Sequence, residues 1–65
     1  MLTEADIQRA ARVVIDKHGS NAAHAAERRI NRLSNQGAVE AAAIWRSIER
    51  AISVMLANKA AAAVD

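Results

Sequence analysis

The stretch from Ala38 to Ala57 constrains the fold more than any other part of the chain, because its apolar residues follow a helical period. At about 100° per residue, the bulky apolar side chains of this stretch, together with Ala41 and Ala51, cover an arc of roughly 140° on one helix. So wide an apolar arc indicates a helix that packs against two others rather than one. Its bulky members recur at intervals of three and four: Ile44, Trp45, Ile48, Ile52, Met55 and Leu56.

Two glycines divide the rest of the chain into helical segments. The sequence has no proline, and 17 of its 65 residues are alanine, the residue with the highest helix propensity. Gly19 and Gly37 each follow a helical pattern, and glycine readily takes the left-handed conformation found at helix ends. We therefore expect an all-α fold, an antiparallel three-helix hairpin or bundle in which the third helix is longest. The predicted helices span residues 4–18, 21–34 and 38–59.

Capping residues support these boundaries. Thr3 is a good N-cap, and Asp6 three residues later makes a weaker form of the capping box, whose usual acid is glutamate. Either Ser20 or Asn21 caps the second helix, and the sequence does not distinguish them. The predicted inward face of the first helix consists of Ile7, Ala11, Val14, Ile15 and His18. That of the second helix is small in its first half and bulky in its second: Ala22, Ala23, Ala26, Ile30 and Leu33.

The length predicts one domain, residues 1–65, with a thin core. A chain of this size buries only about 60% of the surface that its unfolded form exposes. Alanine side chains bury little area, and without cysteine no disulfide adds stability. Residues 60–65 have high helix propensity but little to bury, so we expect a frayed tail there.

The thin core predicts a homo-oligomer, most simply a two-fold dimer. Val13 and Val54 are predicted to point away from the inward faces of their helices, and Val39 is a further candidate. Met55 and Leu56 lie near the end of the third helix, where its shorter partners are not expected to reach. The candidate self-association residues are therefore Val13, Val54, Met55 and Leu56.

Charge and hydropathy give weak statements about partners and compartment. The net charge of +2 is a weak argument for nucleic-acid binding. No apolar run approaches the roughly 20 residues that a membrane span needs. The first residues, MLTEAD, lack the basic start and apolar stretch of a signal peptide. These features predict a soluble, cytoplasmic protein without membrane contact.

No group of residues predicts catalysis, a cofactor or a metal site. The four serines are placed as caps or on solvated helix faces, and no glycine-rich loop can hold a phosphate. His18 and His24 are the only histidines, whereas structural zinc takes about four ligands. We expect His18 to pack its ring at a helix end and His24 to face solvent, and the sequence assigns neither a role.

Arg28, Arg29 and Arg32 are the best candidates for contact with an anion or a partner. Arg28 and Arg32 form a like-charge pair one helical turn apart, which destabilises an isolated helix by a few tenths of a kcal/mol. Such a cluster suits a phosphate or an acidic patch on a partner, although a solvated face is the plainer interpretation. Trp45, Ile48 and Ile52 are predicted to anchor the core.

The order of these features resembles a family of short proteobacterial all-helical proteins to which no function is assigned. The resemblance rests on His18-Gly19 at a helix end, alanines and Arg29 in the second helix, and Gly37 at the second turn. It extends to the pattern Trp-x-x-Ile-x-x-Ala-Ile that begins at Trp45, and it covers roughly residues 6–56. Members often carry an acidic residue after the second glycine, where this chain has Ala38 and Val39. The resemblance implies no activity, cofactor or partner.

The function expected from these patterns is that of a small, non-catalytic interaction or accessory protein. It would act through contacts with an unidentified protein partner and through self-association. The alternative is a nucleic-acid-binding protein that uses the arginine cluster of the second helix. This alternative is disfavoured because the chain has no aromatic residue other than Trp45 to stack on bases.

Overall fold

The computed structural model describes residues 2–63, and every regular element in this range is a helix. The elements are α1 (Glu4–His18), the single 3₁₀ turn η1 (Gly19–Asn21), α2 (Ala22–Asn35) and α3 (Val39–Ala63). Because η1 joins α1 to α2 without a loop, helical structure is continuous over residues 4–35, and the described chain has two helical stretches, 4–35 and 39–63, where the sequence predicts three separate helices. The first stretch changes direction at Gly19, where the sequence predicts the break.

The helix boundaries lie close to the predicted ones. α1 has the predicted limits, and α2 begins and ends one residue later than predicted. α3 begins one residue later and continues through Ala63, four residues past the predicted end. Residues 60–63 of the predicted frayed tail are thus helical, whereas residues 64–65 lie outside the described residues.

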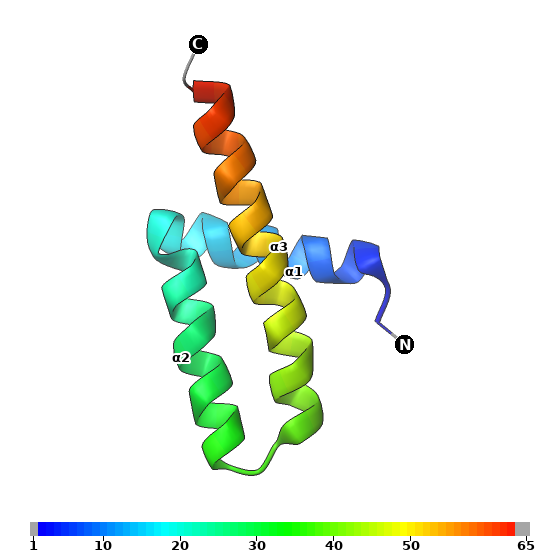
Figure 1. Ribbon diagram of the computed structural model, residues 1–65. Coiled ribbons are helices and arrows are strands. Elements are labelled where there is room, and N and C mark those ends of the chain that lie inside the picture. Colours follow the sequence, from blue (N-terminus) through cyan, green and yellow to red (C-terminus); the bar gives the residue numbers. More distant parts are fainter. Residues whose placement is uncertain (1, 64–65) are drawn as a thin grey trace.

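The helices do not form the antiparallel bundle that the sequence predicts. Figure 1 shows α2 and α3 side by side as an antiparallel hairpin, while α1 lies across this hairpin instead of along it. The change of direction comes from Gly19, whose φ of 59° and ψ of −133° end α1. The 3₁₀ turn then leads straight into α2, so no loop brings α1 alongside its neighbours. α1 packs more extensively on α3 than on α2.

The core lies where α1 crosses the hairpin. Its central cluster of buried residues is three alanines, Ala11, Ala22 and Ala26, together with Ile48 and Ile52 of α3. Ile30 of α2 and Ala42 of α3 are also buried, outside this cluster. Small side chains allow the helix backbones to approach closely at this crossing. The burial of Ile48 and Ile52 confirms the prediction for these two residues of α3.

Several residues are more or less buried than the sequence predicts, because α1 lies across the hairpin and covers only part of α3. Trp45 is half-buried at the edge of the core rather than enclosed in it. Met55 and Leu56, predicted to lack partners, are partly buried and pack against the core. Ile44 and His18, predicted to face inward, are exposed. The crossing angle of α1 determines these outcomes, and the spacing of apolar residues does not contain it.

Local sequence accounts for the ends of the helices. The backbone N–H of Thr3 donates to Asp6 Oδ2 at 3.0 Å, and the N–H of Asp6 donates to Thr3 Oγ1 at 3.2 Å. The capping box is therefore complete with aspartate in place of glutamate. The hydrogen bond from the Thr3 backbone and then that from its hydroxyl lower the pKa of Asp6, outweighing desolvation, and the charge of Arg9 lowers this pKa further.

The two remaining helix ends use different backbone geometries. At the end of α2, the N–H of Ala38 donates to the carbonyl of Leu33 at 2.9 Å, and that of Gly37 donates to Ser34 at 3.0 Å. This pair of bonds is a Schellman motif, and Gly37 has the positive φ of 75° that it requires. Asn21 occupies the N-cap position of α2, but its side chain makes no capping hydrogen bond.

α3 extends well beyond its partners. Its 25 residues give a length of about 38 Å, against about 21–23 Å for α1 and α2. Figure 1 shows its C-terminal part projecting past the crossing with α1, and residues 57–62 are all exposed. Within residues 2–63, no helix combines the length and the apolar character needed to span a membrane.

Candidate functional site

Two grooves lie along α1, one toward each of its ends. The first, here called the basic groove, has a volume of about 360 Å³ and lies between the C-terminal half of α1, the helix α2 and one side chain of α3. The second, here called the apolar groove, has a volume of about 790 Å³ and lies between the N-terminal half of α1 and α3.

The basic groove is built from two helix faces and an indole. α1 contributes Val13, Val14, Lys17 and His18, which recur at the three- and four-residue spacing of one helix face. α2 contributes a second face with the same spacing, and Trp45 from α3 completes the lining. The α2 residues are Ala25, Arg28, Arg29 and Arg32.

Arg29 and Trp45 join the α2 side of the basic groove to α3. The guanidinium carbon of Arg29 lies 4.9 Å from the centroid of the Trp45 ring, within the range of a cation–π interaction. Trp45 is half-buried, because one side of it packs against the core while the other faces this groove. The contact holds Arg29 against the indole and covers one ring face.

Positive charge accumulates in the basic groove without local compensation. Three arginines and Lys17 carry charge there at neutral pH, and none of the described residues that line it is acidic. Among residues 2–63, the one ion pair closer than 4.0 Å joins Arg9 and Asp6, at 3.7 Å, and it lies on another part of α1. The arginines of the basic groove are exposed to solvent. Such a surface attracts anions and binds carboxylates or phosphates through charge-assisted hydrogen bonds.

The apolar groove exposes bulky hydrophobic side chains. Leu2, Ile44 and Val54 are 52%, 37% and 54% exposed, and all three line this groove. Partly buried Ile7 and Met55 form its base together with Ala51. The rest of its lining is polar or charged, with charges of both signs: Thr3, Glu4, Gln8, Arg12, Ser47, Arg50 and Asn58. With no excess of one charge, this groove suits contact with a surface that is partly apolar rather than recognition of an anion.

The predicted site residues are distributed between these two surfaces. Arg28, Arg29 and Arg32 lie together in the basic groove, with His18 beside them. The four predicted self-association residues do not form one patch: Val13 lines the basic groove, Val54 and Met55 line the apolar groove, and Leu56 packs against the core. The two valines lie in different grooves, at opposite halves of α1.

Sequence reasoning missed several lining residues. The sequence does not single out Lys17, and it predicts His18 on the inward face of the first helix, although the basic character of both residues is visible in the sequence. Ile44 was assigned to the core, yet Ile44, Ala51 and Val54 share a stripe with Ser47 at intervals of three and four residues. That spacing was a readable signal for a second apolar surface.

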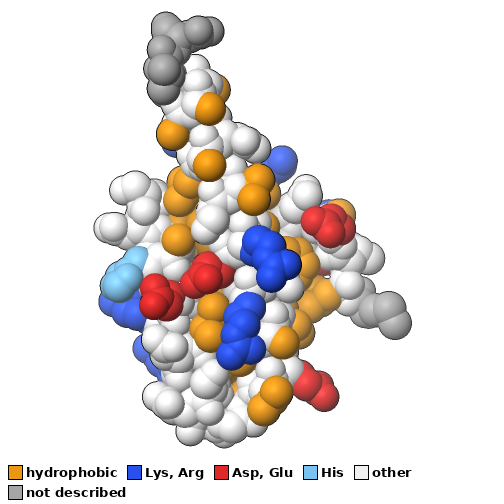
Figure 2. All heavy atoms as spheres, viewed as in Figure 1, with side chains coloured by type: hydrophobic (Ala, Val, Ile, Leu, Met, Phe, Trp, Pro, Cys, Tyr) orange, Lys and Arg blue, Asp and Glu red, His pale blue; other side chains and the backbone are white. Residues whose placement is uncertain are grey.

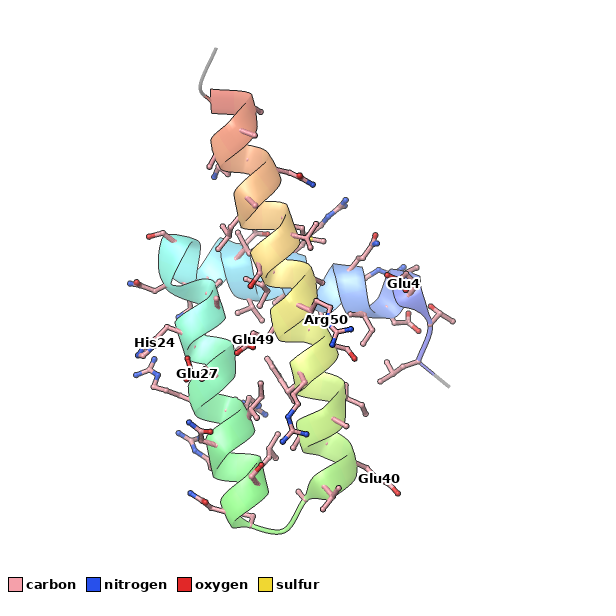
Figure 3. The ribbon with its side chains drawn as sticks, in the orientation of Figure 1. Glu4, His24, Glu27, Glu40, Glu49 and Arg50 are labelled. Atoms are coloured by element: carbon pink, nitrogen blue, oxygen red, sulfur yellow. The ribbon has the colours of Figure 1, made fainter. Side chains whose placement is uncertain are left out.

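The face of the hairpin turned away from α1 has mixed charge. Figure 2 shows acidic and basic side chains next to one another on this face. In Figure 3, Glu49 of α3 lies between the two helices, Glu27 lies on the same face over α2, and Arg50 follows on α3. His24 points outward from α2, as predicted, and is exposed. This face lacks the single-sign character of the basic groove.

In the described part of the chain, no three His, Cys, Asp or Glu side chains gather closely enough to hold a metal ion. Comparison with known protein families, curated proteins and solved structures finds no match to this chain. The resemblance to the proteobacterial family therefore stays a prediction, and the function is argued from the two grooves.

Proposed function

We propose that this protein is a small, non-catalytic interaction protein that acts in the cytoplasm by binding a protein partner and a second copy of itself. The observation that carries the proposal is the apolar groove, which Leu2, Ile44 and Val54 all line while remaining exposed. Bulky apolar side chains left exposed in one groove of a protein of this size mark a place where another surface docks.

A second copy of this chain is the proposed occupant of the apolar groove. The core of one copy is small and built largely from alanine, so additional apolar burial has a large effect on its stability. A two-fold pairing of α3 with its symmetry mate would cover Ile44, Val54 and Met55 in both copies at once. Such a dimer becomes more stable as protein concentration rises, because association is linked to folding.

The test is sedimentation equilibrium over a wide concentration range, combined with thermal melts at the same concentrations. We expect a monomer–dimer equilibrium and a melting temperature that rises with concentration. The variant Val54→Lys should remove both effects. Val39→Lys is the matched control, because Val39 is also an exposed valine of α3 and does not line the apolar groove. A single monomeric wild-type species would refute the dimer.

A nucleic-acid-binding function is the second candidate, and the basic groove is the observation that favours it. Arg28, Arg29 and Arg32 together with Lys17 could neutralise several phosphates. In that case, replacing Arg28 and Arg32 with glutamine weakens binding to every sequence and reduces its salt dependence. A gel shift at low salt with single-stranded and duplex oligonucleotides tests this candidate, and the absence of any shift for the wild type eliminates it.

A pull-down from the native cell distinguishes the two classes of partner. The tagged protein is recovered with and without nuclease treatment. A protein partner that remains bound after nuclease treatment supports the first proposal. Recovery that depends on intact nucleic acid supports the second.

A further inference from the structure

The basic groove combines two features that a purely electrostatic surface does not need. Its rims carry the exposed side chains of Lys17, Arg28 and Arg32, whereas its floor is apolar and includes the partly buried side chains of Val14, Ala25 and Trp45. A free anion such as phosphate pairs with the basic side chains of the rims but leaves the apolar floor in contact with water. A ligand that fills this groove must therefore carry negative charge and an apolar group together.

The spacing of the arginines matches that of acidic residues on a helix. Arg28 and Arg32 are one turn apart on α2, so their attachment points are separated by about 6 Å along the helix axis. Two carboxylates at positions i and i+4 of a partner helix have the same separation. Guanidinium groups bind carboxylates through two parallel hydrogen bonds, which makes this arrangement both strong and directional.

Two observations disfavour nucleic acid as the occupant. Arg29 already covers one face of Trp45 at 4.9 Å, so that face cannot stack on a base. The positive charge also does not continue as a track onto the face of the hairpin turned away from α1, because Glu27 and Glu49 lie on that face (Figure 3). A phosphate backbone extends over many charges and needs such a track.

We infer that the basic groove binds a short acidic segment of a partner protein, with one apolar side chain on the groove floor and carboxylates paired to Arg28 and Arg32. This inference rests on the proposed function, because it assumes that the partner is a protein. It is independent of the dimer, which uses the apolar groove on the other half of α1.

The experiment measures binding of a synthetic helical peptide composed of glutamate and alanine with a single central leucine. A dye on the peptide reports binding by fluorescence anisotropy. Trp45, the only tryptophan, reports it independently through a change in its emission. Three further probes are a peptide with serine in place of the leucine, a peptide with glutamine in place of every glutamate, and a single-stranded DNA oligonucleotide.

The central variant is Arg28→Gln with Arg32→Gln, which removes a like-charge pair and should leave the helix intact. The matched control is Arg46→Gln with Lys59→Gln, since both residues are exposed basic residues of α3 and line neither groove. Both variants lose the same charge. Circular dichroism of each variant verifies that the fold is retained.

We expect the first variant to bind the leucine peptide at least tenfold more weakly than the wild type, and the control to bind within about twofold of it. The serine peptide should bind roughly tenfold more weakly because it leaves the floor uncovered. The glutamine peptide should not bind. Each of these results supports the inference.

Three results overturn it. The wild type fails to bind the leucine peptide, the two double variants weaken it equally, or the oligonucleotide binds more tightly than the peptide. If the peptide does not bind, the proposed dimer is still tested separately by sedimentation. If the protein proves to be monomeric, peptide binding is still measured on the monomer.

Discussion

Replacing Gly19 with alanine tests whether the backbone at this residue determines the direction of α1. Gly19 has φ 59° and ψ −133°, which is the mirror image of extended backbone and is open to glycine alone. Gly37, at the other corner, has a φ of 75° and belongs to a Schellman motif, whose left-handed conformation asparagine also tolerates. The two glycines therefore differ in which substitutions they accept.

The loss of stability on substitution comes from backbone strain and not from a steric clash, because a Cβ atom at either glycine meets no heavy atom within 4 Å. A residue forced into a sparsely populated region destabilises the fold by about 1–3 kcal/mol. The reduced entropy of the unfolded chain offsets about 0.4–1 kcal/mol of this. We expect Gly19→Ala to lower the free energy of unfolding by about 1–2 kcal/mol. Total stabilities run at about 0.05–0.15 kcal/mol per residue, so this is a large fraction for a chain of 65 residues.

The assay is urea unfolding followed by circular dichroism and by the fluorescence of Trp45, for alanine and asparagine at each glycine. Asparagine should be tolerated at Gly37, with a loss of less than about 1 kcal/mol, and should be as harmful as alanine at Gly19. A Gly19→Ala variant as stable as the wild type would show that α1 reaches its position without the glycine conformation. Equal losses for asparagine at both sites would refute the distinction between the two corners.

Two further predictions concern the core and the first helix end. Ile52→Ala should destabilise the fold by about 2–5 kcal/mol, because Ile52 is fully buried. Trp45→Ala should destabilise it less despite the larger side chain, because Trp45 is half-buried. Urea titrations compare the two variants, and a larger loss for Trp45→Ala would place the indole in the core. Because its pKa is lowered in the folded state, Asp6 stabilises the fold above its unfolded value of 3.8, and this contribution is lost as the pH falls through the lower folded pKa. Asp6→Asn should therefore be less stable than the wild type at pH 7, with a difference that narrows toward pH 3 in thermal melts; a constant difference would contradict the linkage.

Much of the candidate site was predictable, but not its assembly. The three arginines of α2 were identified because their spacing puts them on one helix face. That Lys17, His18 and Val13 join them, and that Arg29 lies over Trp45, depends on where α1 crosses the hairpin. Side chains from different helices meet only through that crossing, and no spacing within one helix encodes it.

The sequence by itself determined the helices and their ends. Alanine-rich segments, the Thr3–Asp6 capping box and the glycine at each corner act over a few residues, so the boundaries of α1 and α2 fall within one residue of prediction. Ile48 and Ile52 were likewise assigned to the core from their spacing alone, since burial at the centre of a wide apolar arc is independent of which partner covers it.

Only the tertiary structure decided which edges of that arc are covered. The three alanines of the core cluster bring α1 close to the hairpin at one crossing, and Gly19 sets the direction from which it arrives. α1 therefore covers Met55 and Leu56 partly and leaves Ile44 exposed on one side and Trp45 partly buried on the other. Periodicity measures which residues share a face of one helix. The angle between two helices is a property of their joint packing, and it produced the two grooves on which the function of this protein is proposed to rest.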